Sequence, residues 1–162
     1  MKPAAVVMEP RYTVDTCSFT AMRRVYPIDV FPGAWRKLDE LADSRVIIAV
    51  DEVLEELKAE DDEVLQWAQA HSGIFVPLTA EIQTEATKII VSHSTLVDLR
   101  KRKSGADPFV IASAVVHHCS VVTEEKPSGG PGKVKIPDVC KAMKIECINV
   151  LTMLRREGMR LE

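Results

Sequence analysis

The chain has 162 residues, of which 46% are hydrophobic and 28% charged, so we expect residues 1–162 to form a single domain with an ordinary core. Its net charge of −3 argues against binding nucleic acid through bulk positive charge, and its 5% aromatic content argues against an extended base-stacking surface. No apolar run is long enough for a signal peptide or a membrane span, and the four cysteines form no C-x-x-C pair. We therefore expect a cytoplasmic protein with reduced thiols and no membrane partner.

The first half of the chain alternates short apolar runs with helical spacing. Residues 12–15 predict a buried strand that ends on Asp15, and the β-branched run VIIAV at 46–50 predicts a strand covered on both faces. Helices are predicted over 33–42, from Asp51 as an N-cap, and over 62–70.

The second half repeats this alternation. A short strand or extended connection at 74–78 precedes a helix capped by Thr79, and Asp107–Pro108 predicts an N-cap with proline at the first helical position. Further elements are predicted as a strand at 120–123, a flexible loop at 126–135, a helix at 137–143, a strand at 147–150 and a helix at 151–157. Strands that alternate with helices indicate a parallel sheet in a layered α/β domain.

Acidic residues recur where a predicted strand ends or a helix begins. They are Asp15, Glu56, Asp107 and the pair Glu124–Glu125. Each has an ordinary structural explanation as a cap, a helix opening, a solvent-facing side chain or a surface turn. The carboxyl ends of parallel strands converge on one crevice, however, and carboxylates gathered there repel each other unless a hard cation such as Mg²⁺ binds. The positions together favour a metal-dependent site that acts on phosphate.

Three segments resemble the motifs of PIN-domain (PilT N-terminus-like) nucleases. They are TVDTCSF, VDEVLEEL and GADPFVIASAVVHHCSVVTEE, and the resemblance extends from about Tyr12 to Val150. It places Glu56 rather than Glu52 at the second acidic position and Glu125 at the fourth, with Glu124 as a close competitor. VYPIDVFPG and KIPDVC are similar to a largely uncharacterised branch of the family that resembles its toxin-type members. The chain departs from the pattern at Cys17, where the family often has asparagine, and at Glu125, where it commonly has aspartate.

The resemblance implies a three-layer α/β/α sandwich with a central, mainly parallel sheet, and hydrolysis of RNA phosphodiester bonds with Mg²⁺ or Mn²⁺. Asp15 and Asp107 would be the main metal ligands, and Glu56 would ligate the metal or orient a metal-bound water. Glu125, with Glu124 as its competitor, would complete a second, weaker metal site. Thr16 and Thr123 would fix the carboxylates by hydrogen bonds. Mutual repulsion should raise the pKa of at least one of these acids when no metal is bound.

Basic segments near the acids are candidates for RNA contact, with a solvated face and a plain loop as the alternative. They are Arg100, Lys101, Arg102 and Lys103 before Asp107, and Lys126 and Lys133 around the glycine-rich loop. Small nucleases of the family often belong to toxin–antitoxin pairs, so the resemblance also implies an antitoxin protein as a partner. It implies a homodimer as well, because homodimers are common in the family.

The sequence argues against three other sites that parts of it suggest, namely an aspartyl phosphatase site, a P-loop and a zinc site. Cys17 stands where haloacid-dehalogenase phosphatases need a second aspartate, and SGGPGKV lacks the upstream glycine and the hydroxyl of a P-loop. His117 and His118 beside Cys119 have no partner pair at zinc-ligand spacing. A catalytically inactive PIN-like module that binds RNA or a protein partner remains the alternative from a different functional class.

Overall fold

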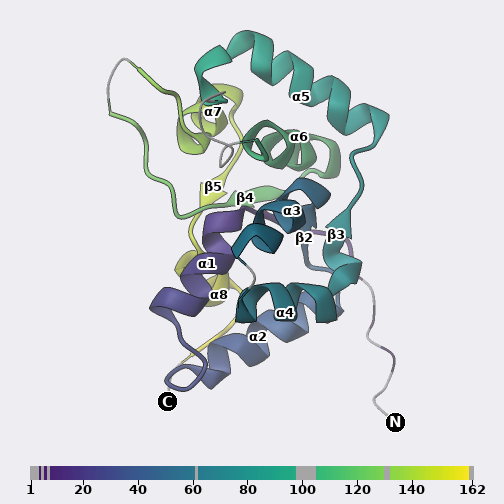
Figure 1. Cartoon of the computed structure of the whole chain (residues 1–162), viewed down its shortest axis with the longest axis vertical. Coiled ribbons are helices and arrows are strands. Elements are labelled where there is room, and N and C mark those ends of the chain that lie inside the picture. The colour runs from purple at the N-terminus through teal and green to yellow at the C-terminus, as the bar shows by residue number, and fades with distance from the viewer. Residues whose placement is uncertain are drawn as a thin grey trace.

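The computed structural model describes residues 4, 6, 8–60, 62–97, 105–129 and 132–160 (Figure 1). Its centre is a five-stranded parallel sheet with the strand order β3-β2-β1-β4-β5. The strands are β1 (Tyr12–Val14), β2 (Ile47–Val50), β3 (Phe75–Val76), β4 (Ser120–Val122) and β5 (Cys147–Ile148). The α-helices are α1 (Thr16–Val25), α2 (Pro32–Asp43), α3 (Asp51–Glu60), α4 (Glu63–Ala70), α5 (Ala80–Ser92), α6 (Asp107–His117), α7 (Ile136–Met143) and α8 (Val150–Arg156), with short 3-10 helices η1 (Ser72–Ile74) and η2 (Ser94–Leu96).

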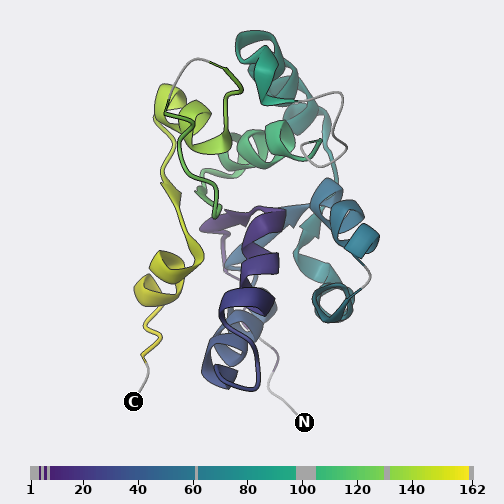
Figure 2. The same cartoon turned by 60° about the vertical axis from the view of Figure 1, so that its left-hand side comes forward.

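Helices cover both faces of the sheet, which confirms the predicted three-layer α/β/α architecture. On one face α6 packs across β1, β2 and β4, and α5 and α7 pack against α6. Figures 1 and 2 show α1, α2, α4 and α8 on the opposite side of the sheet. Because both faces are covered, all the residues of β1 and β2 are buried, as the apolar run at 46–50 predicted.

The buried side chains form one hydrophobic core on both sides of the sheet. Phe19 and Met22 of α1, Ile47 of β2 and Ile111 of α6 are each 0–1% exposed. Removing apolar surface from water contributes about 25 cal/mol per Å² and is the main favourable term in folding. This core holds the ends of the strands in fixed positions relative to α6.

Three helix starts differ from the sequence predictions. Helix α1 was not predicted, and Asp15 is its N-cap rather than the last residue of a strand. Asp107 is not an N-cap, because Ala106 occupies that position and Asp107 is the first residue within α6. Asp51 is likewise the first residue of α3, which follows Val50 of β2 without a connecting residue. Thr79 does cap α5 as predicted, since its hydroxyl accepts the N–H of Ile82 at 3.3 Å.

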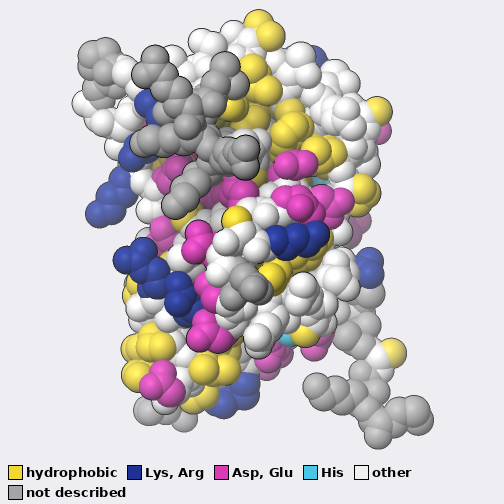
Figure 3. Space-filling model, viewed as in Figure 1, with side chains coloured by type: hydrophobic (Ala, Val, Ile, Leu, Met, Phe, Trp, Pro, Cys, Tyr) yellow, Lys and Arg dark blue, Asp and Glu magenta, His cyan; other side chains and the backbone are white. Residues whose placement is uncertain are grey.

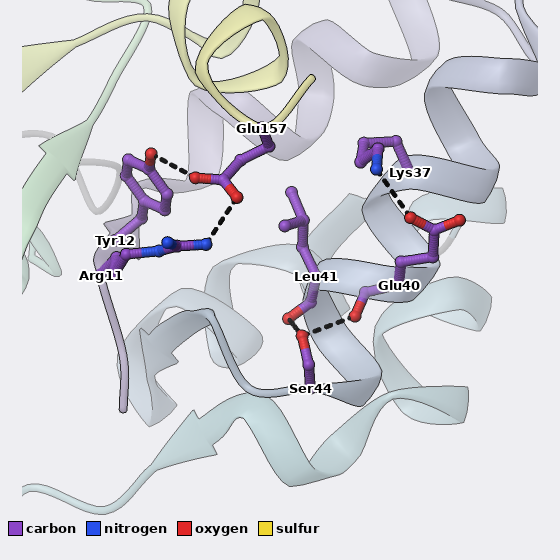
Figure 4. A network of polar contacts seen from close by, with 7 residues as sticks. All are labelled: Arg11, Tyr12, Lys37, Glu40, Leu41, Ser44 and Glu157. Atoms are coloured by element: carbon purple, nitrogen blue, oxygen red, sulfur yellow. Dashed lines mark hydrogen bonds and ion pairs between the residues drawn. The ribbon is translucent and has the colours of Figure 1, made fainter. Parts of the chain in front are cut away.

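Polar contacts attach the C-terminal segment to the start of the sheet (Figure 4). Glu157, which follows α8, accepts a hydrogen bond from the Tyr12 hydroxyl at 2.7 Å and pairs with Arg11 at 2.6 Å. Burial and the bond to Glu157 raise the pKa of Tyr12 to about 12. The C-terminal end of α2 is held locally, because the Ser44 hydroxyl donates to the carbonyl of Glu40 at 2.8 Å.

Histidines end several helices. His71 and His93 are the C-caps of α4 and α5, and His118 ends α6 in the left-handed conformation with φ 54°. Among the helices of the described ranges, none is long and apolar enough to cross a membrane.

Candidate metal centre

Neighbouring strands bring two segments with candidate metal ligands together at the carboxyl edge of the sheet. Asp15 follows β1 directly, and Thr123 follows β4, which pairs with β1. The amide N–H of Asp15 donates to the carbonyl of Val122 at 2.9 Å, so the two segments remain paired one residue beyond the strands. Helix α6 packs over both strands and begins with Asp107. Parallel pairing therefore places residues about 110 positions apart in one site.

Three carboxylates meet there. Asp15, Asp107 and Glu125 each offer an oxygen, and these oxygens lie within 4.8 Å of one another. Asp15 is 4% and Asp107 6% exposed. Carboxylate oxygens at this spacing are the ligand type that Mg²⁺ and Mn²⁺ prefer, and burial of several anions without a cation is unfavourable. The cluster could therefore hold one divalent cation. Figure 3 shows acidic side chains gathered across the middle of this face of the molecule.

Hydrogen bonds fix the carboxylate of Asp15 on both oxygens. Its Oδ1 accepts the N–H of Thr16 at 2.8 Å. Its Oδ2 accepts the Thr123 hydroxyl at 3.0 Å and the Cys17 thiol at 3.0 Å. Donors aimed at a ligand carboxylate hold its orientation before a metal arrives. Thr123 is 3% exposed, so this bond is protected from water.

Glu56 lies beside the three-carboxylate cluster but outside it. Its Oε2 accepts the Thr16 hydroxyl at 2.5 Å, and its Oε1 accepts the N–H of Ala106 at 3.3 Å. Through these two bonds Glu56 connects the residue after Asp15 with the residue before Asp107. The structure therefore places Glu56 where it holds together the segments that carry Asp15 and Asp107.

Glu124 and Glu125 are held by the amino ends of different helices. The N–H of Ile136, at the start of α7, donates to Glu125 Oε2 at 3.1 Å, and the N–H of Val150, at the start of α8, donates to Glu124 Oε1 at 2.8 Å. Unpaired amides and the helix dipole make such positions favourable for carboxylates. Of these two acids, only Glu125 belongs to the cluster.

The electrostatics of the site favour protonation of its acids in the absence of a cation. Burial raises the pKa of Asp107 to about 9, with further contributions from Asp15, Glu125 and Glu56 and an opposing one from Lys133. Burial also raises the pKa values of Asp15, Glu56 and Glu125, against the lowering effect of their hydrogen bonds. A bound cation would reverse this preference by favouring the charged forms.

The sequence reasoning gave Cys17 no role, yet its sulfur lies inside the hydrogen-bond network. Besides its bond to Asp15, it lies 3.3 Å from the Thr123 hydroxyl and accepts the N–H of Glu124 at 3.3 Å. Burial, followed by the charge of Asp15, raises the pKa of this thiol, so it is a neutral donor. Its position in the first turn after the capping Asp15 is the sequence signal that would have placed it here.

The predicted RNA-binding residues are only partly described. Lys126 and Lys133 are exposed, and Lys133 is near enough to lower the pKa values of Asp107 and Glu125. The hydroxyl of Thr95 joins the glycine-rich loop to η2, with bonds to the carbonyl of Gly132 at 3.3 Å and from the N–H of Val134 at 3.1 Å. Residues 100–103 lie outside the described part of the chain.

Comparison with known proteins supports the fold and gives a family. The chain resembles a chain in the crystal structure of VapBC2 from Rickettsia felis bound to a DNA fragment from their promoter, with a TM-score of 0.53 and 14% sequence identity. The match covers 85% of this chain and 97% of that chain, and it shows that the fold is PIN-like. No curated protein matches the sequence. The family model described as Domain of unknown function (DUF4411) matches residues 12–161, and the chain therefore belongs to that family.

Proposed function

We propose that this chain is a metal-dependent endoribonuclease that hydrolyses RNA phosphodiester bonds and forms the toxin half of a toxin–antitoxin pair. The convergence of Asp15, Asp107 and Glu125, with ligand oxygens within 4.8 Å of one another, carries this proposal. The motif resemblance and the PIN-like fold support it. The chain is further proposed to act as one domain over residues 1–162.

The donor set fits Mg²⁺ or Mn²⁺ held by Asp15, Asp107 and Glu125. A divalent cation in such a site supplies Lewis acidity toward a phosphoryl oxygen and lowers the pKa of water. The protein's own contribution is preorganisation, because Asp15 and Glu125 are held by donors before any ligand binds. We propose that Glu56 orients the attacking water, since it borders the cluster and burial raises its pKa above the ordinary value, which favours proton exchange with that water.

The cation also makes an anionic substrate acceptable to an acidic site. The charges of the three carboxylates would otherwise repel a phosphate. Lys133 lies close to Asp107 and Glu125 and is exposed, so we propose that it contacts a phosphate beside the cluster, with Lys126 further along the same loop. Such contacts predict an affinity for RNA that falls as salt rises.

Hydrolysis of single-stranded RNA with Mn²⁺ tests the activity. We expect Asp15→Asn and Asp107→Asn to lower the rate by at least about 100-fold, because each removes a charged ligand. Asp43→Asn, at an exposed position in the last turn of α2, is the matched control and should cleave like the wild type. Binding of Mn²⁺ by isothermal titration calorimetry gives a readout that does not depend on finding the right RNA.

These measurements also separate the enzyme from the inactive PIN-like module. A module would bind RNA or a protein with no cleavage under any divalent metal, and the aspartate variants would leave that binding unchanged. The toxin assignment has its own test, which is growth arrest on expression and rescue by a protein encoded beside it. Growth arrest that persists in Asp107→Asn would contradict a toxin acting through this site.

A further inference from the structure

A small apolar cavity lies apart from the acidic cluster and is not used by the proposed chemistry. It has a volume of about 230 Å³ and is lined by Tyr26, Phe31, Leu151, Leu154, Arg155 and Met159. The chain has only two tyrosines and four phenylalanines, and one of each lines this cavity. Sites for drug-sized ligands measure about 300–1,000 Å³, so this cavity suits one flat ring rather than a large molecule.

The walls of the cavity are held in place by contacts elsewhere in the fold. Tyr26 ends α1 and Phe31 precedes α2, and their rings meet edge to face with centroids 5.7 Å apart. The indole N–H of Trp35 donates to the carbonyl of Tyr26 at 2.7 Å. Both rings remain partly exposed, whereas Leu154 beneath them is 1% exposed. The cavity is therefore preformed.

The cavity is connected to the metal centre through Glu124. This residue precedes Glu125, and its carboxylate accepts the N–H of Val150, the first residue of the helix that supplies Leu151, Leu154 and Arg155. The charge of Glu124 also acts on the Tyr26 hydroxyl, after burial, to raise its pKa. Figure 3 shows Lys and Arg side chains between the acidic band and the hydrophobic side chains at the lower left.

Resting on the proposed function, we propose that this cavity binds one nucleobase of the single-stranded RNA whose phosphate binds at the metal centre. Aromatic rings and arginine planes are the groups on which proteins stack unpaired bases. The guanidinium of Arg155 forms no ion pair with any described residue and is exposed at the edge of the cavity. A single base site is compatible with the low aromatic content, which excludes only an extended stacking surface.

The surrounding surface is aliphatic, which raises a protein segment as the competing occupant. Val25, Ile28 and Val30 are 57–62% exposed beside the two rings. Exposed apolar patches mark either protein interfaces or ligand grooves. The size of the cavity, its two aromatic rings and the exposed guanidinium of Arg155 favour the base.

Cleavage kinetics on RNAs that each lack one base test the proposal. Single abasic nucleotides are placed in turn around the mapped cleavage site, and Tyr26→Leu and Phe31→Leu are compared with the wild type. Loss of one stacked base lowers affinity by roughly 5- to 150-fold. For the wild type we therefore expect KM to rise about 10-fold when the abasic nucleotide is at one particular position of the RNA, and not at the others. With intact RNA, each variant should have a KM about 10-fold above that of the wild type. With the RNA abasic at that position, the KM of the variant should not rise further, and kcat should stay within about 2-fold of the wild-type value.

Phe75→Leu is the control, because Phe75 is a partly exposed aromatic residue on β3, at the opposite edge of the sheet from β5. An equal effect in Phe75→Leu, or additive losses from variant and missing base, would overturn the base site. Crosslinking of 5-iodouridine RNA, mapped by mass spectrometry, gives a readout without turnover and should modify Tyr26 or Phe31; modification only elsewhere contradicts the proposal.

The failure of this site and of the proposed function are distinguishable. Normal cleavage with no dependence on any base overturns the cavity alone. No cleavage, together with Mn²⁺ binding that Asp107→Asn does not change, overturns the nuclease and the cavity with it. If Tyr26→Leu keeps wild-type RNA kinetics but loses a protein partner, the occupant is a protein segment and the base site is wrong.

Discussion

Cys17 joins the two segments that carry Asp15 and Glu125, two carboxylates of the candidate metal centre. Its thiol donates to Asp15 Oδ2 after β1, and its sulfur accepts the N–H of Glu124 after β4. Asparagine, which PIN-domain nucleases often have at the matching position, could make the same two bonds through its amide, with a donor and an acceptor in one side chain. The thiol is therefore a chemical substitute for the amide in this chain, with a weaker donor and a weaker acceptor.

This substitution predicts how Cys17 variants bind Mn²⁺. Loss of a donor to a ligand carboxylate typically costs about 10- to 100-fold in metal affinity, so we expect a loss of that size in Cys17→Ala. Cys17→Ser keeps a donor and an acceptor and should stay within about 3-fold of the wild type. Isothermal titration calorimetry with Mn²⁺ measures both, and unfolding midpoints check the fold. Equal affinity in all three proteins would show that the thiol does not position Asp15.

Helix α6 begins with a carboxylate of the candidate site and continues as an almost entirely apolar helix. Asp107 opens it, and Val110, Ile111 and Ala112 are 0% exposed where it crosses the sheet. One polar atom interrupts this surface, because the hydroxyl of Ser113 is buried without a hydrogen-bond partner among the described residues. A buried hydroxyl without a partner is destabilising.

Ser113→Ala is therefore expected to stabilise the protein. Removal of the unpaired hydroxyl should raise the free energy of unfolding by about 1 kcal/mol, since the methyl group fits the same space. Urea unfolding, followed by far-UV circular dichroism, measures the change, with Ser92→Ala at the exposed end of α5 as the control. A loss of stability in Ser113→Ala would show that the hydroxyl has a partner in solution.

The raised carboxyl pKa values connect the site to the stability of the whole molecule. An acid whose pKa is higher in the folded than in the unfolded state contributes stability that is lost as pH rises through the folded value. For Asp107 this interval runs from the ordinary value of 3.8 to about 9. Asp15, Glu56 and Glu125 shift in the same direction.

We therefore predict that the metal-free protein loses stability between pH 4 and pH 9. Asp107→Asn should lose less stability over this pH interval, because it lacks one of the titrating carboxyl groups. Near pH 9 its free energy of unfolding should exceed that of the wild type. Mn²⁺ at about 100 times its dissociation constant should add about 2.7 kcal/mol to the wild type, with the larger effect at high pH. Chemical unfolding at a series of pH values with EDTA or Mn²⁺ measures this. Parallel curves for the two proteins would contradict the assignment to Asp107.

The sequence was sufficient for the elements with strong local signals. The apolar run at 46–50 and the Thr79 cap gave β2 and α5 within a residue or two, because burial on both faces and a capping hydroxyl leave direct traces in the sequence. Helix α1 left a weak trace, since TCSFT is poor in strong helix formers and its stability comes from burying Phe19 and Met22. The N-cap prediction for Asp107 was wrong because an Asp-Pro pair usually opens a helix with aspartate as the cap. Here Ala106 is the N-cap, and the carboxylate of Asp107 belongs to the three-carboxylate cluster.

By itself the sequence determined the alternating elements, the layered α/β class and the acids that follow strands or open helices, since these depend on local periodicity and on residue type. Only the tertiary structure decided which acids meet. The strand order β3-β2-β1-β4-β5 places the ends of β1 and β4 side by side, and Asp15, Asp107 and Glu125 form the cluster there. Glu56 and Glu124 lie beside the cluster and accept hydrogen bonds from Thr16 and Val150 instead. The same packing brought Cys17 into the network and Tyr26 beside α8. Contacts between residues far apart in the sequence depend on how buried surfaces fit together, which no local pattern records.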